Sequence, residues 1–263
     1  MPPGEPALVP AASPAWRVFA NPVTLFVGGV AAVLLELAEP RVRHGVWDHS
    51  SFRTDPLTRL KRTGLAALVT VYGPASTACA MIERIGRLHG QVSGTTDAGA
   101  PYRADDPELL DWVQATASWG FLEAYAAFDT RVAEAERDRY YADVAPVAAL
   151  YGATGSPRTD AEARALIERM RAKLEPSATL FEFLAIMRGV HALPAAARPL
   201  QPALLKAAVS LLPTGIAERL GLVRGWRLSA VERALVQTAA RTAGRLDLES
   251  WPSHQARQRL RVA

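Results

Sequence analysis

The chain has 263 residues, of which 49% are hydrophobic and 21% are charged. This balance is ordinary for a soluble globular protein and predicts one large domain, because no linker-like segment divides the interior. Lysine and arginine exceed the acidic residues by only four, 30 against 26, which is too little to predict a nucleic-acid partner. The single cysteine, Cys79, excludes an intramolecular disulfide and cysteine-rich metal sites, and it fits a reducing cytoplasm.

The two ends of the chain predict neither a signal peptide nor an anchor. The N-terminus is rich in Pro and Ala and lacks a Lys/Arg start, so residues 1–20 are predicted to be a disordered lead-in. The longest apolar run, 23–35, has about 13 residues and is shorter than the roughly 20 that a membrane-spanning helix needs. We therefore expect a cytoplasmic protein with a helical domain at 21–245 and a basic, solvated tail at 246–263.

Helical periodicity, interrupted by proline and glycine, predicts an all-α fold of roughly ten helices. The predicted helices are 23–38, 58–73, 75–92, 107–128, 134–151, 160–174, 177–189, 203–212, 213–220 and 229–243. Residues 40–57 are predicted to be a polar loop or a broken helix, and residues 94–106 a second loop. No segment has the sustained period-two alternation of a β-strand.

The helix pair on either side of Gly73-Pro74 carries the sharpest candidate site. Arg59 and Thr63 are four residues apart and therefore share one face of the first helix. On the second helix, His89 continues an apolar stripe of Ala78, Ile82 and Ile85. A neutral imidazole on such a face suits a flat, iron-bearing cofactor, with Arg59 on a haem propionate and a Thr63 hydroxyl near the iron. The alternatives are a core histidine, a surface arginine and a threonine bonded to its own helix backbone.

Other polar residues allow two interpretations each. His49 and Asp48 lie in a segment that is either a solvated turn or a cover for the cofactor pocket. Glu123 continues an aromatic stripe formed by Trp112 and Trp119, which predicts a buried acid that needs a partner. Dinucleotide, phosphate-loop, zinc-protease, nucleophile-elbow and nucleic-acid motifs are all missing from the sequence.

The order of several motifs resembles one known family. These motifs are EPRVRHGVWDHSSF, DPLTRLKRTG, VYG, HGQVSG and YRADDPELLDWVQAT, followed by AERDRYYADVAPVAALYG and LLPTGIAERLGL. Together they cover about residues 20–225 and resemble the MpaB-type oxygenases, which include the latex-clearing rubber oxygenases. The resemblance implies an all-helical, globin-like core that holds a non-covalent haem b. It implies that His89 is the axial iron ligand and that Arg59 and Thr63 form the family's Arg-x-x-x-Thr element.

Two positions depart from the family pattern. Glu39-Pro40 stands where members often have His-Pro, so Glu39 receives no role. Arg62 stands where rubber-cleaving members have a lysine that can bind the iron, with Lys61 one residue earlier. Because arginine keeps its proton and offers no lone pair, we expect the second axial position to be open.

The resemblance implies an enzyme that uses haem b and dioxygen to oxidise a small apolar substrate, with isoprenoids and other alkenes as candidates. His89 would bind the metal, and Arg59, Thr63 and His49 would be the catalytic residues. Oxidative cleavage of a carbon–carbon double bond is the family's best-known reaction, and hydroxylation, desaturation or peroxidation would need the same site. The electron donor is not identified. The alternatives are a non-catalytic haem sensor or carrier and a helical interaction protein without a cofactor.

Overall fold

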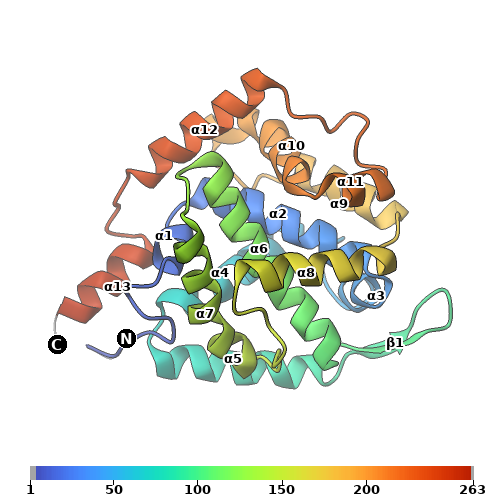
Figure 1. Cartoon of the computed structure of the whole chain (residues 1–263), viewed down its shortest axis with the longest axis horizontal. Coiled ribbons are helices and arrows are strands. Elements are labelled where there is room, and N and C mark those ends of the chain that lie inside the picture. The colour runs from blue at the N-terminus through green and yellow to red at the C-terminus, as the bar shows by residue number, and fades with distance from the viewer. Residues whose placement is uncertain (1–3, 262–263) are drawn as a thin grey trace.

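The computed structural model describes residues 4–261, and helices make up nearly all of its regular structure (Figure 1). The helices are α1 (Ala15–Val18), α2 (Pro22–Ala38), α3 (Pro40–Trp47), α4 (Pro56–Tyr72), α5 (Ala75–His89), α6 (Pro107–Phe128), α7 (Glu134–Leu150), α8 (Asp160–Met170), α9 (Ala178–Gly189), α10 (Gln201–Leu211), α11 (Thr214–Arg219), α12 (Ala230–Gly244) and α13 (Pro252–Arg261). Two short 3₁₀ turns, η1 (Arg171–Lys173) and η2 (Ala195–Leu200), and two strands, β1 (Ser93–Thr95) and β2 (Pro101–Arg103), complete the structure. The predicted all-α class is confirmed, while the globin-like arrangement stays a prediction.

Helices α2 and α6 cross at the centre of the molecule (Figure 1). The side chain of Asn21 caps α2 by accepting hydrogen bonds from the backbone N–H groups of Val23 and Thr24. At the crossing, a Cβ on Gly28 would lie only 2.5 Å from the carbonyl oxygen of Gly120. The two helix backbones therefore touch directly, and only glycine fits at this point of each helix.

The remaining helices cover the central pair on different sides. Helices α9, α10 and α12 pack around α2, and α7 and α8 pack on α6. The main core lies between α2, α6, α9 and α10, and a second cluster joins α1, α4, α6 and α7. Helix α4 packs chiefly against α13, α5 and α1. This arrangement leaves much of its middle turn exposed.

Residues 4–20 and 246–261, predicted as parts of a disordered lead-in and a solvated tail, make contacts with the helical domain. The indole N–H of Trp16 donates to the carbonyl of Val9 at 3.1 Å, and the Tyr72 hydroxyl donates to the carbonyl of Trp16 at 2.7 Å. Arg259 on α13 is buried and donates to the carbonyls of Tyr72 and Glu5. The composition of these segments did not indicate that a few large side chains bury there. Residues 1–3 and 262–263 lie outside the described part of the chain.

Regular structure occurs in the segment predicted as a polar loop or a broken helix, 40–57, and in the segment predicted as a loop, 94–106. Helix α3 begins at Pro40 because Glu39 accepts a hydrogen bond from the backbone of Val42 at 2.8 Å. Strands β1 and β2 form an antiparallel hairpin, and Gly99 in its turn has φ +78°, which favours glycine. Each strand has only three residues, which is too short for an alternating pattern to show.

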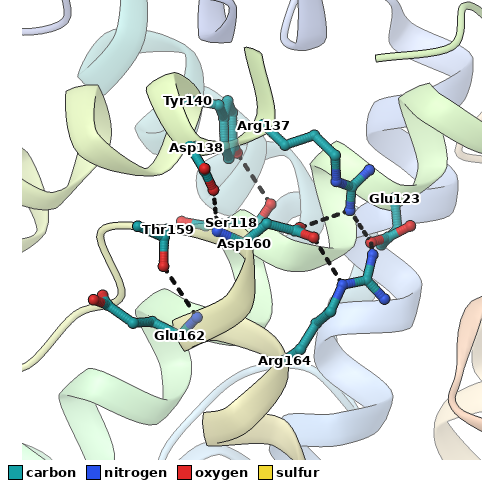
Figure 2. A network of polar contacts seen from close by, with 9 residues as sticks. All are labelled: Ser118, Glu123, Arg137, Asp138, Tyr140, Thr159, Asp160, Glu162 and Arg164. Atoms are coloured by element: carbon teal, nitrogen blue, oxygen red, sulfur yellow. Dashed lines mark hydrogen bonds and ion pairs between the residues drawn. The ribbon is translucent and has the colours of Figure 1, made fainter. Parts of the chain in front are cut away.

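The partner predicted for Glu123 is an arginine network that joins α6, α7 and α8 (Figure 2). Arg137 pairs with Glu123 and, at 2.8 Å, with Asp160, while Arg164 pairs with Asp160 at 2.7 Å and with Glu123 at 3.1 Å. Two acids shared between two arginines leave neither carboxylate uncompensated. This network is structural and fastens three helices together.

No single helix in residues 4–261 has the length and apolar character needed to cross a membrane. Helices α2 and α3 together pass that test, but the chain bends by 111° between them.

Candidate functional site

Helix α4 places Arg59 and Thr63 side by side, as their spacing predicts. The helix begins after Asp55, whose side chain accepts a hydrogen bond from the backbone of Thr58 at 3.2 Å. A terminal guanidinium nitrogen of Arg59 donates to the Thr63 hydroxyl, which in turn donates to the carbonyl of Arg59 at 3.0 Å. Thr63 therefore makes the ordinary backbone bond of a helical threonine and also contacts the guanidinium.

Helix α5 ends at His89, with Gly90 following it. The imidazole is partly buried, and burial lowers the pKa of His89 below its ordinary value of 6.5. The positive charge of Arg59 lowers this pKa further, and the carboxylate of Asp105 opposes the shift. Within residues 4–261 neither ring nitrogen of His89 makes a hydrogen bond. The ring is thus neutral at pH 7, and its lone pair is available to a metal.

A third group, Glu36 on α2, lies close enough to Arg59 for their charges to interact. Burial raises the pKa of Glu36 from 4.5 to about 7. The Thr116 hydroxyl donates to this carboxyl group at 3.3 Å, and this bond and the charge of Arg59 partly offset the shift. At neutral pH Glu36 can therefore both give and take a proton.

The surroundings of these groups leave open space beside them. Glu36, Arg59 and His89 are largely surrounded by protein, yet each keeps some accessible surface. A Cβ built on Gly64 or on Gly86 would meet no atom within 4 Å. Gly64 follows Thr63, and Gly86 lies one turn before His89. Both glycines are exposed, so this surface of the two helices carries no side chain at these two positions.

The donor set fits haem better than a bare metal ion. Among the described residues there is no group of three or more His, Cys, Asp and Glu side chains that could hold a metal. Haem iron needs only one imidazole from the protein, and its propionates need a cation. His89 and Arg59 supply these two groups from adjacent helices, and the only other partners found for Arg59 are the Thr63 hydroxyl and the nearby Glu36.

His49 is held with the hairpin and does not join this group. Its Nε2 atom lies 3.0 Å from the hydroxyl of Tyr102 on β2, and the residue is exposed. Nearby, Nδ1 of His44 lies 2.8 Å from a carboxylate oxygen of Asp48. In the described part of the chain, neither His49 nor Asp48 shares a hydrogen bond or ion pair with Arg59, Thr63 or His89. The catalytic role expected of His49 stays a prediction.

Two residues of the site were not predicted from the sequence. Glu36 is the only charged residue in the apolar stretch 23–38, a signal that could have identified it. Asp105 follows the hairpin and binds Arg103 at 2.9 and 2.8 Å, and its charge reaches His89. Nothing in the local sequence indicates that this turn returns to the end of α5.

The positions that depart from the family pattern have separate roles. Glu39 is buried, binds Arg41 at 2.8 Å and caps α3, so it belongs to the framework. Lys61 and Arg62 are exposed on α4. Two surface hollows lie elsewhere, around Asp111 and around Asp129.

A family model described as ER-bound oxygenase mpaB/B'/Rubber oxygenase, catalytic domain, matches residues 16–245. The chain belongs to this family. The match confirms the resemblance seen in the sequence motifs, and it includes Glu36, Arg59, Thr63 and His89. Membership in the mpaB/rubber oxygenase family makes the protein an oxygenase. No curated protein and no solved structure matches the chain significantly.

Proposed function

We propose that this protein is a haem b-dependent oxygenase that acts on a small apolar substrate. The observation that carries the proposal is that Arg59 on α4 interacts through its charge with both Glu36 on α2 and His89 on α5. The family match, which includes all three residues, supports an oxygenase. When bound, the haem supplies an iron centre at which dioxygen can react.

In this proposal His89 holds the iron and Arg59 holds a propionate. The lowered pKa of His89 keeps its imidazole neutral, as an iron ligand requires. The charge of Asp105 reaches His89, and a hydrogen bond from the second ring nitrogen to this carboxylate would fix the orientation of the ring. The guanidinium of Arg59 would form a charge-assisted bond to the propionate.

Thr63 and Glu36 would supply the polar groups near the substrate. The Thr63 hydroxyl now accepts from Arg59, and it would accept no such bond once the guanidinium turned toward a propionate. With a pKa of about 7, the carboxyl group of Glu36 can give a proton to a developing product oxygen and take it back, so that no net proton is transferred.

The chemistry of the reaction class favours double-bond cleavage. One dioxygen molecule and one carbon–carbon double bond give two carbonyl groups, so the atoms and electrons balance without an external reductant. Hydroxylation and desaturation would each require an electron donor as well.

Because Lys61 and Arg62 are both exposed on α4, we also expect the second axial position of the iron to remain open to small ligands.

The test is to purify the full chain from haem-rich medium, record its visible spectrum and follow dioxygen uptake with a panel of alkenes. We expect a Soret band, and two carbonyl groups formed for each dioxygen consumed. A colourless protein would contradict the proposal. A Soret band with no turnover of any alkene would instead favour a haem sensor or carrier.

A further inference from the structure

The segment 223–248, which contains α12, concentrates exposed apolar side chains. Five of the nine large apolar side chains with the highest exposure among the described residues lie in this segment. They are Val223 (53% exposed), Val231 (71%), Leu235 (54%), Leu246 (50%) and Leu248 (45%). Single exposed leucines are normal on a protein surface, but such a concentration in one segment requires an explanation.

The outer face of α12 is not covered by another element of the described chain. Val231 and Leu235 are four residues apart and point to the same side of the helix, and both are exposed. Val236 and Ala240 lie on the opposite side and are fully buried, where α12 packs against α2, α6 and α10. Figure 1 shows α12 along the outer edge of the molecule. The helix is therefore amphipathic, but its outer face also carries apolar side chains.

The same segment carries an uncompensated positive charge. The segment holds five arginines and two acidic residues, so its formal net charge is +3. The formal net charge of the whole chain is +4. Both acids are already paired with residues outside the segment: Glu232 with Lys206 at 2.6 Å, and Asp247 with His254 at 3.1 Å. Among residues 4–261, none of the five arginines makes an ion pair, and Arg233 instead lies over the ring of Phe128.

We propose that the outer face of α12 and the residues flanking it dock on an anionic lipid membrane. Apolar side chains beside arginines are the pattern of helices that lie in a membrane interface, where the side chains enter the acyl boundary and the arginines meet lipid phosphates. A second copy of the chain would bring arginines against arginines at this face, so charge complementarity favours lipid. The proposal is independent of the haem and of the reaction.

The experiment is sedimentation of the full-length protein with vesicles of phosphatidylcholine alone or of phosphatidylcholine mixed with phosphatidylserine. We expect binding to the mixed vesicles that weakens as salt is added, and little binding to the neutral ones. Leu235→Glu should reduce this binding by about tenfold or more, because it places a charge where an apolar side chain enters the interface. The matched control is Leu150→Glu, since Leu150 on α7 is 51% exposed and lies outside the segment.

A second pair of variants tests the charge. Arg241→Gln combined with Arg245→Gln should weaken binding by about tenfold or more, whereas Arg158→Gln, at an exposed site in another loop, should not. Three results would overturn the proposal: no binding to mixed vesicles, equal and salt-independent binding to neutral ones, or equal effects of Leu235→Glu and Leu150→Glu. Self-association that Leu235→Glu abolishes, without vesicle binding, would identify a dimer interface instead.

Discussion

At the scale of single residues, burial favours the neutral form of both Glu36 and His89. The pKa of the carboxyl group is raised to about 7 and that of the imidazole is lowered. Arg59 interacts with both through its permanent charge, and its own pKa is lowered by burial without loss of its proton. A site with one fixed cation, one neutral base and one acid that titrates near pH 7 suits an anionic cofactor and proton transfer.

Glu36 should give the haem-free protein a distinctive pH dependence of stability. Its folded-state pKa of about 7 exceeds its ordinary value of 4.5, so between these values the folded state holds the additional proton. The free energy of unfolding should therefore rise as the pH falls from about 7 towards 4.5. Glu36→Gln should remove this contribution and be more stable than the wild type above pH 7 by roughly 3 kcal/mol. Urea unfolding of both proteins between about pH 5 and pH 8 measures the difference, and parallel curves would refute the assignment.

Arg59→Ala should weaken haem retention and leave the iron ligation spectrum nearly unchanged. A charge-assisted hydrogen bond contributes about 1.5–3 kcal/mol, so haem dissociation should accelerate about tenfold or more. The measurement is the rate of haem transfer to apomyoglobin. Arg62→Ala is the matched control, because Arg62 lies on the same helix and is exposed. Equal transfer rates for the two variants would show that Arg59 holds no propionate.

At the scale of elements, the crossing of α2 and α6 fixes the position of Glu36. Glu36 lies two turns after Gly28 on α2, and its carboxyl group reaches Thr116, which lies one turn before Gly120 on α6. A shift in that crossing would move Glu36 relative to Arg59, whose helix packs mainly elsewhere. The central helix pair thus serves both the core and the site.

Adjacent glycines allow a direct test of this crossing. Gly28→Ala would place a Cβ 2.5 Å from the Gly120 carbonyl oxygen, so we expect the free energy of unfolding to fall by about 2–3 kcal/mol. Gly29→Ala would meet only the Phe121 ring at 3.7 Å and should be neutral, or stabilising by up to about 1 kcal/mol through helix propensity. Chemical denaturation of the two variants provides the comparison, and equal stabilities would mean that the helices are not in backbone contact.

The sequence predicts elements well where local signals are long and consistent. Helix α6 could be predicted to the residue, because Asp106 caps it, Pro107 begins it and apolar periodicity continues for six turns. Helices α1 and α3 and the hairpin are too short for a pattern to be distinguished from a loop.

Arg59, Thr63 and His89 were predicted as site residues from local spacing and from the family motifs. The proximity of Glu36 and Asp105 depends on tertiary packing, which no local pattern encodes, and the role expected of His49 stays a prediction.

At the scale of the whole molecule, the two termini hold the helix that carries Arg59. Arg259 on α13 binds the carbonyl of Tyr72 at the end of α4, and Glu5 binds Ser76 at the start of α5. Helix α13 lies beyond the region that matches the family, which ends at residue 245. The oxygenase domain of this chain is thus stabilised by a segment outside the shared domain.

Removing the buried guanidinium of Arg259 should show how far the stability of the oxygenase domain depends on α13. Arg259→Met keeps an apolar stem but leaves the carbonyls of Tyr72 and Glu5 without their donor, which should cost about 1.5–3 kcal/mol of stability. Arg257→Met, on the same helix but partly exposed and 3.8 Å from Asp247, should cost less than about 1 kcal/mol. Thermal unfolding of both variants measures the difference. Similar melting temperatures for wild type and Arg259→Met would mean that α13 is dispensable.

The visible spectrum and haem stoichiometry of His89→Ala test most directly whether His89 binds the iron of a haem. The control is His191→Ala, which changes an exposed histidine outside the site. We predict that the wild type and His191→Ala carry one haem per chain with the same Soret band. His89→Ala should lose the haem or bind it weakly with a shifted band. A His89→Ala protein that keeps the wild-type Soret band and a full complement of haem would contradict the account.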